Sequence, residues 1–97
     1  MKPVQIYVKE GCKFAARARQ LLMAQGALFH EKDITYAEEL RREMIERSGG
    51  AETTPQIFIG DEHIGGFEEL EKLQKSGELA KKLSWTGDPD DLRSSHV

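Results

Sequence analysis

A change of hydrophobic period near the N-terminus constrains the fold more than any other feature of the chain. Residues 4–8, Val-Gln-Ile-Tyr-Val, are rich in β-branched and aromatic side chains and predict a largely buried strand. After a short polar turn, apolar residues recur at helical spacing from Cys12 to Gln25, and Gly26 is the expected helix stop. A strand that runs directly into a helix is the first half of a strand–helix–strand unit, which predicts an α/β fold.

The rest of the chain alternates between the two periods up to residue 83. Apolar residues are sparse in the second strand, which we therefore expect nearer an edge of the sheet. Gly60-Asp61 between two β-rich runs is typical of a tight hairpin. In chain order we expect a strand over 27–34, a helix over 36–47, hairpin strands over 56–59 and 62–64, a helix from 67, and a last short helix over 78–83.

Thr35 and Glu38 have the spacing of a capping box, which predicts Thr35 as the N-cap of the helix that follows. Tyr36, Leu40 and Met44 recur at helical spacing behind it. We therefore expect these three side chains to share one face of that helix.

The order strand, helix, strand, helix, hairpin, helix predicts a four-stranded mixed β-sheet flanked by helices on both faces. The first crossover is expected to be parallel and right-handed, and the hairpin adds antiparallel strands. With 97 residues the chain has room for one domain, which we expect over 1–84. Residues 85–97 show no periodicity and contain Gly, Pro and polar residues, so we expect a flexible C-terminal tail there.

Charge and composition exclude several classes of partner. The formal net charge is −3 and no basic stripe is present, so nucleic acid is not an expected partner. No apolar run approaches the roughly 18 residues of a membrane span, and the N-terminal residues lack the apolar core of a signal peptide. We therefore expect no membrane partner and a cytoplasmic location. One cysteine excludes an internal disulfide, and the spacings of His30, His63 and His96 match no common metal site.

Cys12, the single cysteine, lies where the strand pattern gives way to the helix. N–H groups in the first turn of a helix have no intrahelical partner and carry the positive end of the helix dipole, which favours a thiolate there. Lys9 and Lys13 add positive charge on either side. Such settings lower a cysteine pKa below its usual value of about 8.5, and Cys12 is therefore the candidate nucleophile. The alternative for a lone cysteine is a small buried apolar side chain.

Two other segments are expected at the same end of the sheet. Pro55 directly precedes a core strand, and a cis Thr54-Pro55 bond would turn the Thr54 N–H and C=O toward a ligand. An ordinary trans proline at a strand start is the alternative. Gly65-Gly66 lets a ligand approach the backbone, and the N-terminal N–H groups of the helix from Phe67 can hold a carboxylate. A plain loop-to-helix junction is the alternative there.

Taken together, three separated motifs resemble the glutaredoxin family. They stand in family order and spacing over residues 4 to 83 and read Ile6-Tyr7 leading to Lys9-Glu10-Gly11-Cys12, then Thr53-Thr54-Pro55-Gln56-Ile57-Phe58-Ile59-Gly60, then Ile64-Gly65-Gly66-Phe67-Glu68-Glu69-Leu70. The resemblance implies a thioredoxin-like fold, a cis bond before Pro55, and glutathione as partner thiol and co-substrate.

By position, the resemblance assigns Cys12 as the nucleophile that takes up glutathione as a mixed disulfide. It implies that Lys9 and Arg47 approach the glycine carboxylate, and that Thr54 pairs its backbone with the cysteine residue of the tripeptide. Glu68 would face the amine of the γ-glutamyl end. The implied glutathione-binding residues are Lys9, Phe14, Arg47, Thr54, Pro55, Gly66, Phe67 and Glu68.

Ala15 is the main departure from the family pattern. Many members have Cys-x-x-Cys, but this chain has Cys12-Lys13-Phe14-Ala15, so Ala15 occupies the resolving-cysteine position and no intramolecular disulfide can form. What remains is a monothiol cycle in which a second glutathione reduces Cys12. Two explanations of Ala15 stay open: a natural residue, or an engineered Cys→Ala or Ser→Ala change in a dithiol enzyme.

The resemblance predicts a monomeric glutathione-disulfide oxidoreductase that reduces glutathionylated proteins or small disulfides through Cys12, with no metal. The alternative is a binding module in which two chains and two glutathiones hold an iron–sulfur cluster through Cys12. Relatives suited to that role carry Cys-Gly-Phe-Ser and an extra loop segment after the lysine. Here Lys13 replaces the glycine, and Lys9 is only three residues before Cys12.

Overall fold

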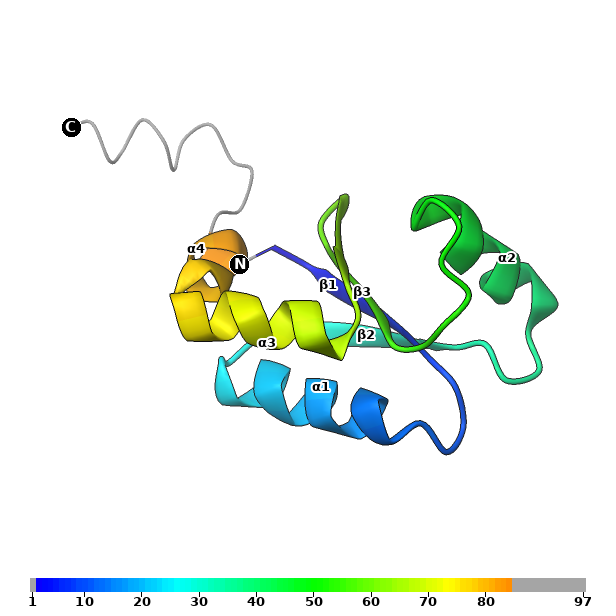
Figure 1. The fold of residues 1–97 in the computed structure, drawn as a ribbon, viewed down its shortest axis with the longest axis horizontal. Helices are drawn as coiled ribbons and strands as arrows, with labels where there is room; N and C mark the ends of the chain where they lie inside the picture. The colour runs from blue at the N-terminus through cyan, green and yellow to red at the C-terminus, as the bar shows by residue number, and fades with distance from the viewer. Residues whose placement is uncertain (1, 85–97) are drawn as a thin grey trace.

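The structure of the protein is a computed structural model that describes residues 2–84 (Figure 1). Its elements, in chain order, are β1 (Val4–Val8), α1 (Lys13–Ala24), β2 (Phe29–Asp33), α2 (Glu38–Arg47), β3 (Gln56–Ile59), β4 (Glu62–Gly65), α3 (Phe67–Ser76) and α4 (Glu78–Ser84). This order confirms the one expected from the sequence. The tail expected over 85–97 lies outside the described residues. Within 2–84, no helix is both long enough and apolar enough to cross a membrane.

The four strands form one mixed sheet in the order β2-β1-β3-β4. β1 pairs with β2 in parallel and with β3 antiparallel, and the β3–β4 hairpin is antiparallel. The expected four-stranded mixed sheet is therefore confirmed, with β2 at one edge. The hairpin turns at Gly60, whose φ of 60° is a left-handed conformation that glycine adopts without strain.

Helices cover both faces of the sheet, as expected. α1, α3 and α4 lie on one face and α2 lies on the other (Figure 1). Successive residues of a strand point to opposite faces, so Ile6 packs with α1 and α3 while Tyr7 points toward α2. Ile57 and Phe58 repeat this pattern on β3. The two faces therefore have separate cores around the same pair of central strands.

The capping box predicted at Thr35 is wrong. α2 begins at Glu38 with Ala37 as its N-cap, and no side chain caps it. The Thr35 hydroxyl is engaged elsewhere: its oxygen accepts the Glu10 N–H at 2.8 Å, and its O–H donates to the Asp33 carboxylate at 2.5 Å. The hydroxyl hydrogen bond, together with one from the Thr35 N–H, holds the pKa of Asp33 below its usual value.

Two helix starts also differ from the sequence-based expectation. Tyr36 precedes α2 and 93% of its surface is exposed, so it does not share a helix face with the buried Met44. Cys12 is the N-cap of α1 and has an extended backbone, so it lies just before the first helical turn and not within it. Its sulfur therefore projects from the junction between β1 and α1.

Glu69 fixes the start of α3. Its carboxylate accepts the Gly66 N–H at 2.7 Å. Gly65 has a φ of +117°, and a Cβ there would lie 2.8 Å from a Glu69 carboxylate oxygen, so both the backbone and the available space require glycine. A Cβ on Gly66 would lie 3.4 Å from the Pro55 carbonyl oxygen. The glycine pair thus brings the first turn of α3 close to Pro55.

Candidate active site

Cys12 is held against the loop that precedes β3. Its thiol donates a hydrogen bond to the Thr54 carbonyl oxygen at 3.4 Å, and its N–H donates to the Lys9 carbonyl oxygen at 3.1 Å. The side chain is partly exposed. A thiol can donate to the Thr54 carbonyl whereas a thiolate cannot, so ionisation of Cys12 releases this contact.

Charged residues of both signs surround Cys12. A hollow of about 340 Å³ beside it is lined by the cations Lys9, Lys13 and Arg19 and by the carboxylates Glu10 and Asp33, among others. Arg19 is paired with Glu31 on β2, and the first turn of α1 contains no acidic residue. Lys9 and Lys13 are both exposed. Lys9, Lys13 and the N-terminus of α1 therefore place positive charge beside Cys12.

The Thr54-Pro55 peptide bond is cis, as the family resemblance implied. Pro55 is buried, and Thr54 beside it is partly exposed. Among residues 2–84, no acceptor takes a hydrogen bond from the Thr54 N–H. The Thr54 N–H is therefore available to a ligand next to the cysteine sulfur.

A groove on the α3 side of Thr54, which we call the α3 groove, has a volume of about 160 Å³. It brings together six of the predicted glutathione-binding residues, and its lining consists of Phe14, Thr53, Thr54, Pro55, Gly66, Phe67, Glu68 and Glu69. The rings of Phe14 and Phe67 are stacked with centroids 6.0 Å apart, and Phe14 is 51% exposed. The α3 groove thus contains two stacked aromatic rings and the N-terminus of a ten-residue helix, which begins at Phe67.

A second groove on the other side of Thr54, which we call the α2 groove, has a volume of about 320 Å³. Its lining consists of Lys9, Ile34, Thr35, Tyr36, Ala37, Glu38, Arg41, Glu52 and Thr54. The two grooves share Thr54, and the Cys12 sulfur contacts the carbonyl of that residue. An extended ligand that pairs with Thr54 would therefore reach into both grooves.

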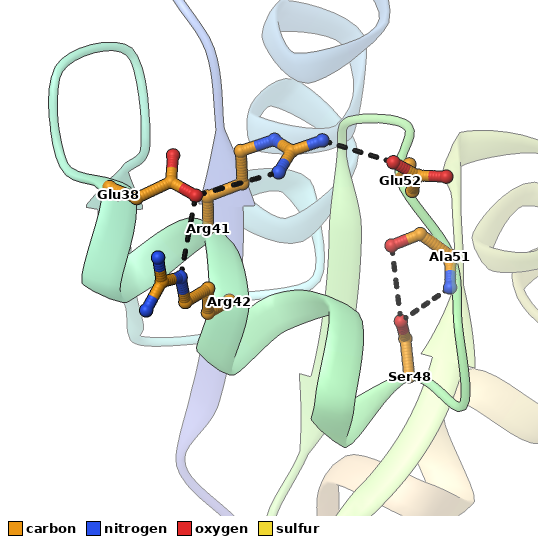
Figure 2. A network of polar contacts seen from close by, with 6 residues as sticks. All are labelled: Glu38, Arg41, Arg42, Ser48, Ala51 and Glu52. Atoms are coloured by element: carbon orange, nitrogen blue, oxygen red, sulfur yellow. Dashed lines mark hydrogen bonds and ion pairs between the residues drawn. The ribbon is translucent and has the colours of Figure 1, made fainter.

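Arg41 and Glu52 are site residues that the sequence analysis missed. Figure 2 shows the Arg41 guanidinium between two carboxylates, 3.0 Å from Glu52 and 3.8 Å from Glu38. The Ala51 N–H donates to the Ser48 hydroxyl oxygen at 3.0 Å, which ties the loop after α2 back to the helix (Figure 2). The spacing of Glu38 and Arg41 is a recognisable helical pair, but only the folded loop brings Glu52 to them.

Arg47, which the family resemblance assigned to the glycine carboxylate of glutathione, lines neither groove in the structure. Its guanidinium donates to the Gln5 side chain at 2.5 Å and to the Tyr7 hydroxyl at 2.7 Å. It also lies 4.1 Å from the centroid of the Phe58 ring. These contacts place Arg47 on the sheet face beneath α2, where it stabilises the fold.

Ala15 is fully buried in the apolar core below Cys12. Its position on α1 is three residues from Cys12, where a resolving thiol would stand. Within residues 2–84, no group of three His, Cys, Asp or Glu side chains could hold a metal ion. Cys12 is the single cysteine of the chain.

Comparison with known proteins gives the same family for the chain. A family model described as Glutaredoxin matches residues 4–64. Glutaredoxin 3 of Escherichia coli strain K12 is 46% identical over 79 residues, which cover 81% of this chain and 94% of that protein. The solution structure of a glutaredoxin from Brucella melitensis is 48% identical and has a TM-score of 0.76, with 91% of this chain and 94% of that chain covered.

A more distant solved structure shares the fold. The crystal structure of a buckwheat glutaredoxin–glutathione complex has a TM-score of 0.77 at 23% identity, with 86% of this chain and 77% of that chain covered. These superpositions confirm the thioredoxin-like fold expected for the sheet and its helices. With a family model over most of the chain and relatives close to half identical, the protein belongs to the glutaredoxin family of thiol oxidoreductases.

Proposed function

We propose that the protein reduces glutathione mixed disulfides, with Cys12 as its only catalytic sulfur. The observation that carries this proposal is the position of Cys12, whose sulfur lies 3.4 Å from the carbonyl oxygen of Thr54, the residue that lines both the α3 groove and the α2 groove. Membership of the glutaredoxin family supports thiol redox chemistry. The buckwheat glutaredoxin, which shares the fold, was solved as a complex with glutathione.

Each groove would hold one end of the tripeptide. In the α3 groove, N–H groups at the start of α3 would hold the γ-glutamyl carboxylate, and Glu68 would face its amine. In the α2 groove, Lys9 and Arg41 would face the glycine carboxylate. Thr54 between them would pair its N–H and C=O with the cysteine residue of the ligand. The sulfur of that residue then faces Cys12.

The reaction needs two thiol–disulfide exchanges. In the first, the Cys12 thiolate attacks the glutathione sulfur of a mixed disulfide. The Cys12–glutathione bond forms as the substrate disulfide breaks, and the substrate sulfur leaves as a thiolate that takes a proton from water. In the second, a glutathione thiolate attacks the glutathione sulfur bound to Cys12, which releases oxidised glutathione and restores the Cys12 thiolate. Overall, one mixed disulfide and one glutathione give the substrate thiol and one oxidised glutathione, half of which comes from the substrate.

The second exchange must use an external thiol, because the chain has one cysteine and Ala15 occupies the position of a resolving sulfur. The iron–sulfur alternative would instead require Cys12 from two chains and two glutathiones. A brown protein with visible absorption that is lost on removal of glutathione would support that alternative. Cytoplasmic location and the monomeric state stay predictions.

The test is intact mass after mixing with oxidised glutathione, together with steady-state turnover of a glutathionylated peptide in excess reduced glutathione. We expect one glutathione adduct on the wild type and turnover, with neither in the Cys12→Ser variant. Absence of an adduct at neutral pH would overturn the assignment of Cys12 as nucleophile. An adduct without turnover would show that the chain traps glutathione and does not complete the cycle.

A further inference from the structure

Gln56 is the only polar residue in the described part of the chain that is buried, with 4% of its surface exposed. It is the first residue of β3 and directly follows Pro55. Because side chains alternate along a strand, Gln56 lies on the same sheet face as Phe58. A buried amide is costly unless its donors and its acceptor are satisfied, so its partners show what it holds in place.

The Gln56 side chain links β4 to the loop beside Cys12. Its Nε2 donates to the Thr53 carbonyl oxygen at 3.0 Å and to the Thr53 hydroxyl oxygen at 3.3 Å. Its Oε1 lies 2.7 Å from Nε2 of His63, which must carry the hydrogen because an amide oxygen only accepts. The His63 ring is packed on Phe58 with centroids 4.9 Å apart. These contacts fix the orientation of the amide, since a flipped amide would face its oxygen toward the Thr53 carbonyl.

The planar geometry of the Thr53-Thr54 peptide links the orientation of Gln56 to the residues beside Cys12. Thr54-Pro55 is the cis bond of the described chain, so the Thr53-Thr54 peptide is trans and planar. In a trans peptide the C=O and the next N–H point in opposite directions. Gln56 holds the Thr53 carbonyl and therefore sets the direction of the Thr54 N–H, which has no acceptor within residues 2–84.

We infer that Gln56 is a positioning residue for glutathione. It holds the Thr53-Thr54 peptide so that the Thr54 N–H meets the backbone of the ligand, and His63 keeps the Gln56 amide in the required orientation. Gln56 itself touches no reacting atom. This inference rests on the proposed function, because it assigns Thr54 as the residue that pairs with the tripeptide.

The test compares Gln56→Met with Gln5→Met. Both changes replace a glutamine on the same sheet face by an apolar side chain of similar length, and Gln5 bonds to Arg47 and not to the loop beside Cys12. Three quantities are measured: KM and kcat for a glutathionylated peptide, and the rate at which iodoacetamide alkylates Cys12. We expect Gln56→Met to raise KM roughly five-fold, as for one misaligned hydrogen bond, with kcat and alkylation changed less than two-fold. Gln5→Met should leave all three unchanged.

His63→Phe is the second variant, and it keeps the ring on Phe58 while removing the N–H donor. Because His63 is exposed, this variant should fold even if Gln56→Met does not, and we expect a smaller rise in KM. An unchanged KM in both variants, or equal losses in Gln56→Met and Gln5→Met, would overturn the positioning role. A fall in the Cys12 alkylation rate as large as the rise in KM would also overturn the positioning role, because it would indicate general damage to the site. A wild type that does not turn over the peptide would overturn the proposed function as well.

Discussion

The two faces of the sheet are built from different kinds of contact. The face covered by α1, α3 and α4 packs twelve buried residues, all of them apolar. The face covered by α2 packs only four buried hydrophobic residues, around Tyr7 and Phe58, and it also carries the buried amide of Gln56. On that second face the Tyr7 hydroxyl donates to Glu43 and accepts from Arg47, and Lys32 donates to Glu43 at 2.8 Å. One face is a continuous apolar core, and the other is a small core surrounded by hydrogen-bonded polar groups.

This difference shows how the fold separates stability from ligand binding. Burial of apolar surface is the larger contribution to folding, so the face with α1 and α3 should dominate stability. The face beneath α2 holds polar side chains that extend to the loop after α2 and to Thr53, beside both grooves. Contacts from that face that reach Thr53 or the loop after α2 should therefore affect the site, whereas contacts that reach neither, such as that of Gln5 with Arg47, should act mainly on the free energy of unfolding.

The largest expected effect is the loss of an apolar side chain from the first face. Leu70 on α3 is fully buried, and Leu70→Ala should lower the free energy of unfolding by about 2–5 kcal/mol. Met44→Ala is the matched change on α2 and should cost less, because the smaller core around it can relax into the space. Urea unfolding of both variants checks which loss is larger, provided that the free energy of unfolding falls with urea at the same slope in each. A Met44→Ala loss equal to that of Leu70→Ala would contradict the contrast between the faces.

Next in size is the loss of the Tyr7 hydroxyl. Tyr7→Phe keeps the buried ring and its edge contact with Phe58 but removes the shared partner of Glu43 and Arg47. Both partners are partly exposed and keep another contact, Glu43 with Lys32 and Arg47 with Gln5, so we expect a loss of about 0.5–1.5 kcal/mol. A double-mutant cycle with Glu43→Gln measures the coupling. Additive losses would show that the polar groups beneath α2 act independently.

The pH dependence of the free energy of unfolding should show how much the Glu43 carboxylate contributes to stability. Hydrogen bonds from Lys32 and then from Tyr7 hold the pKa of Glu43 below its usual value. A carboxylate with a lowered folded-state pKa adds stability above its unfolded pKa of about 4.3, and this stability is lost as the pH falls through the folded pKa. The stability difference between wild type and Glu43→Gln should therefore be constant at neutral pH and shrink in acid.

Glu46→Gln is the control for that profile, because Glu46 is an exposed carboxylate on α2 whose side chain makes no hydrogen bond or ion pair within residues 2–84. Its difference from the wild type should stay near zero across the same range. A Glu46→Gln profile that matches that of Glu43→Gln would mean that net charge, and not the contacts of Glu43, sets the acid response.

The fold was predictable because its signals are local. The period of apolar residues distinguishes Ile6 from Tyr7, and the Gly60 turn determines the hairpin without reference to distant residues. The α3 groove was predictable for a similar reason, since Gly66, Phe67 and Pro55 stand in recognisable motifs.

The polar contacts were not predictable because distant residues compete for the same groups. Thr35 fits a capping box in sequence, but the Glu10 N–H reaches its hydroxyl from 25 residues away. Arg47 was assigned to the ligand, but Tyr7 and Gln5 bind it from β1. Arg41 occupies the groove instead, and no pattern in the sequence relates it to Glu52. Tertiary structure decides which cation of α2 lines the α2 groove.

The smallest effect expected is on ligand affinity, through Glu52. In the free protein its carboxylate lies 3.0 Å from Arg41, at the place where the proposed function puts the glycine carboxylate of glutathione. A ligand must compete with Glu52, which is 68% exposed, so the pair is worth little and Glu52→Gln should lower KM roughly two-fold, about 0.4 kcal/mol. The gain should shrink at high salt, because ions screen the contact that Glu52 makes.

Glu39→Gln removes the same charge from an exposed position on α2 outside the groove and should leave KM unchanged. Equal KM values for the two variants would mean that overall charge, and not occupation of Arg41, sets the affinity.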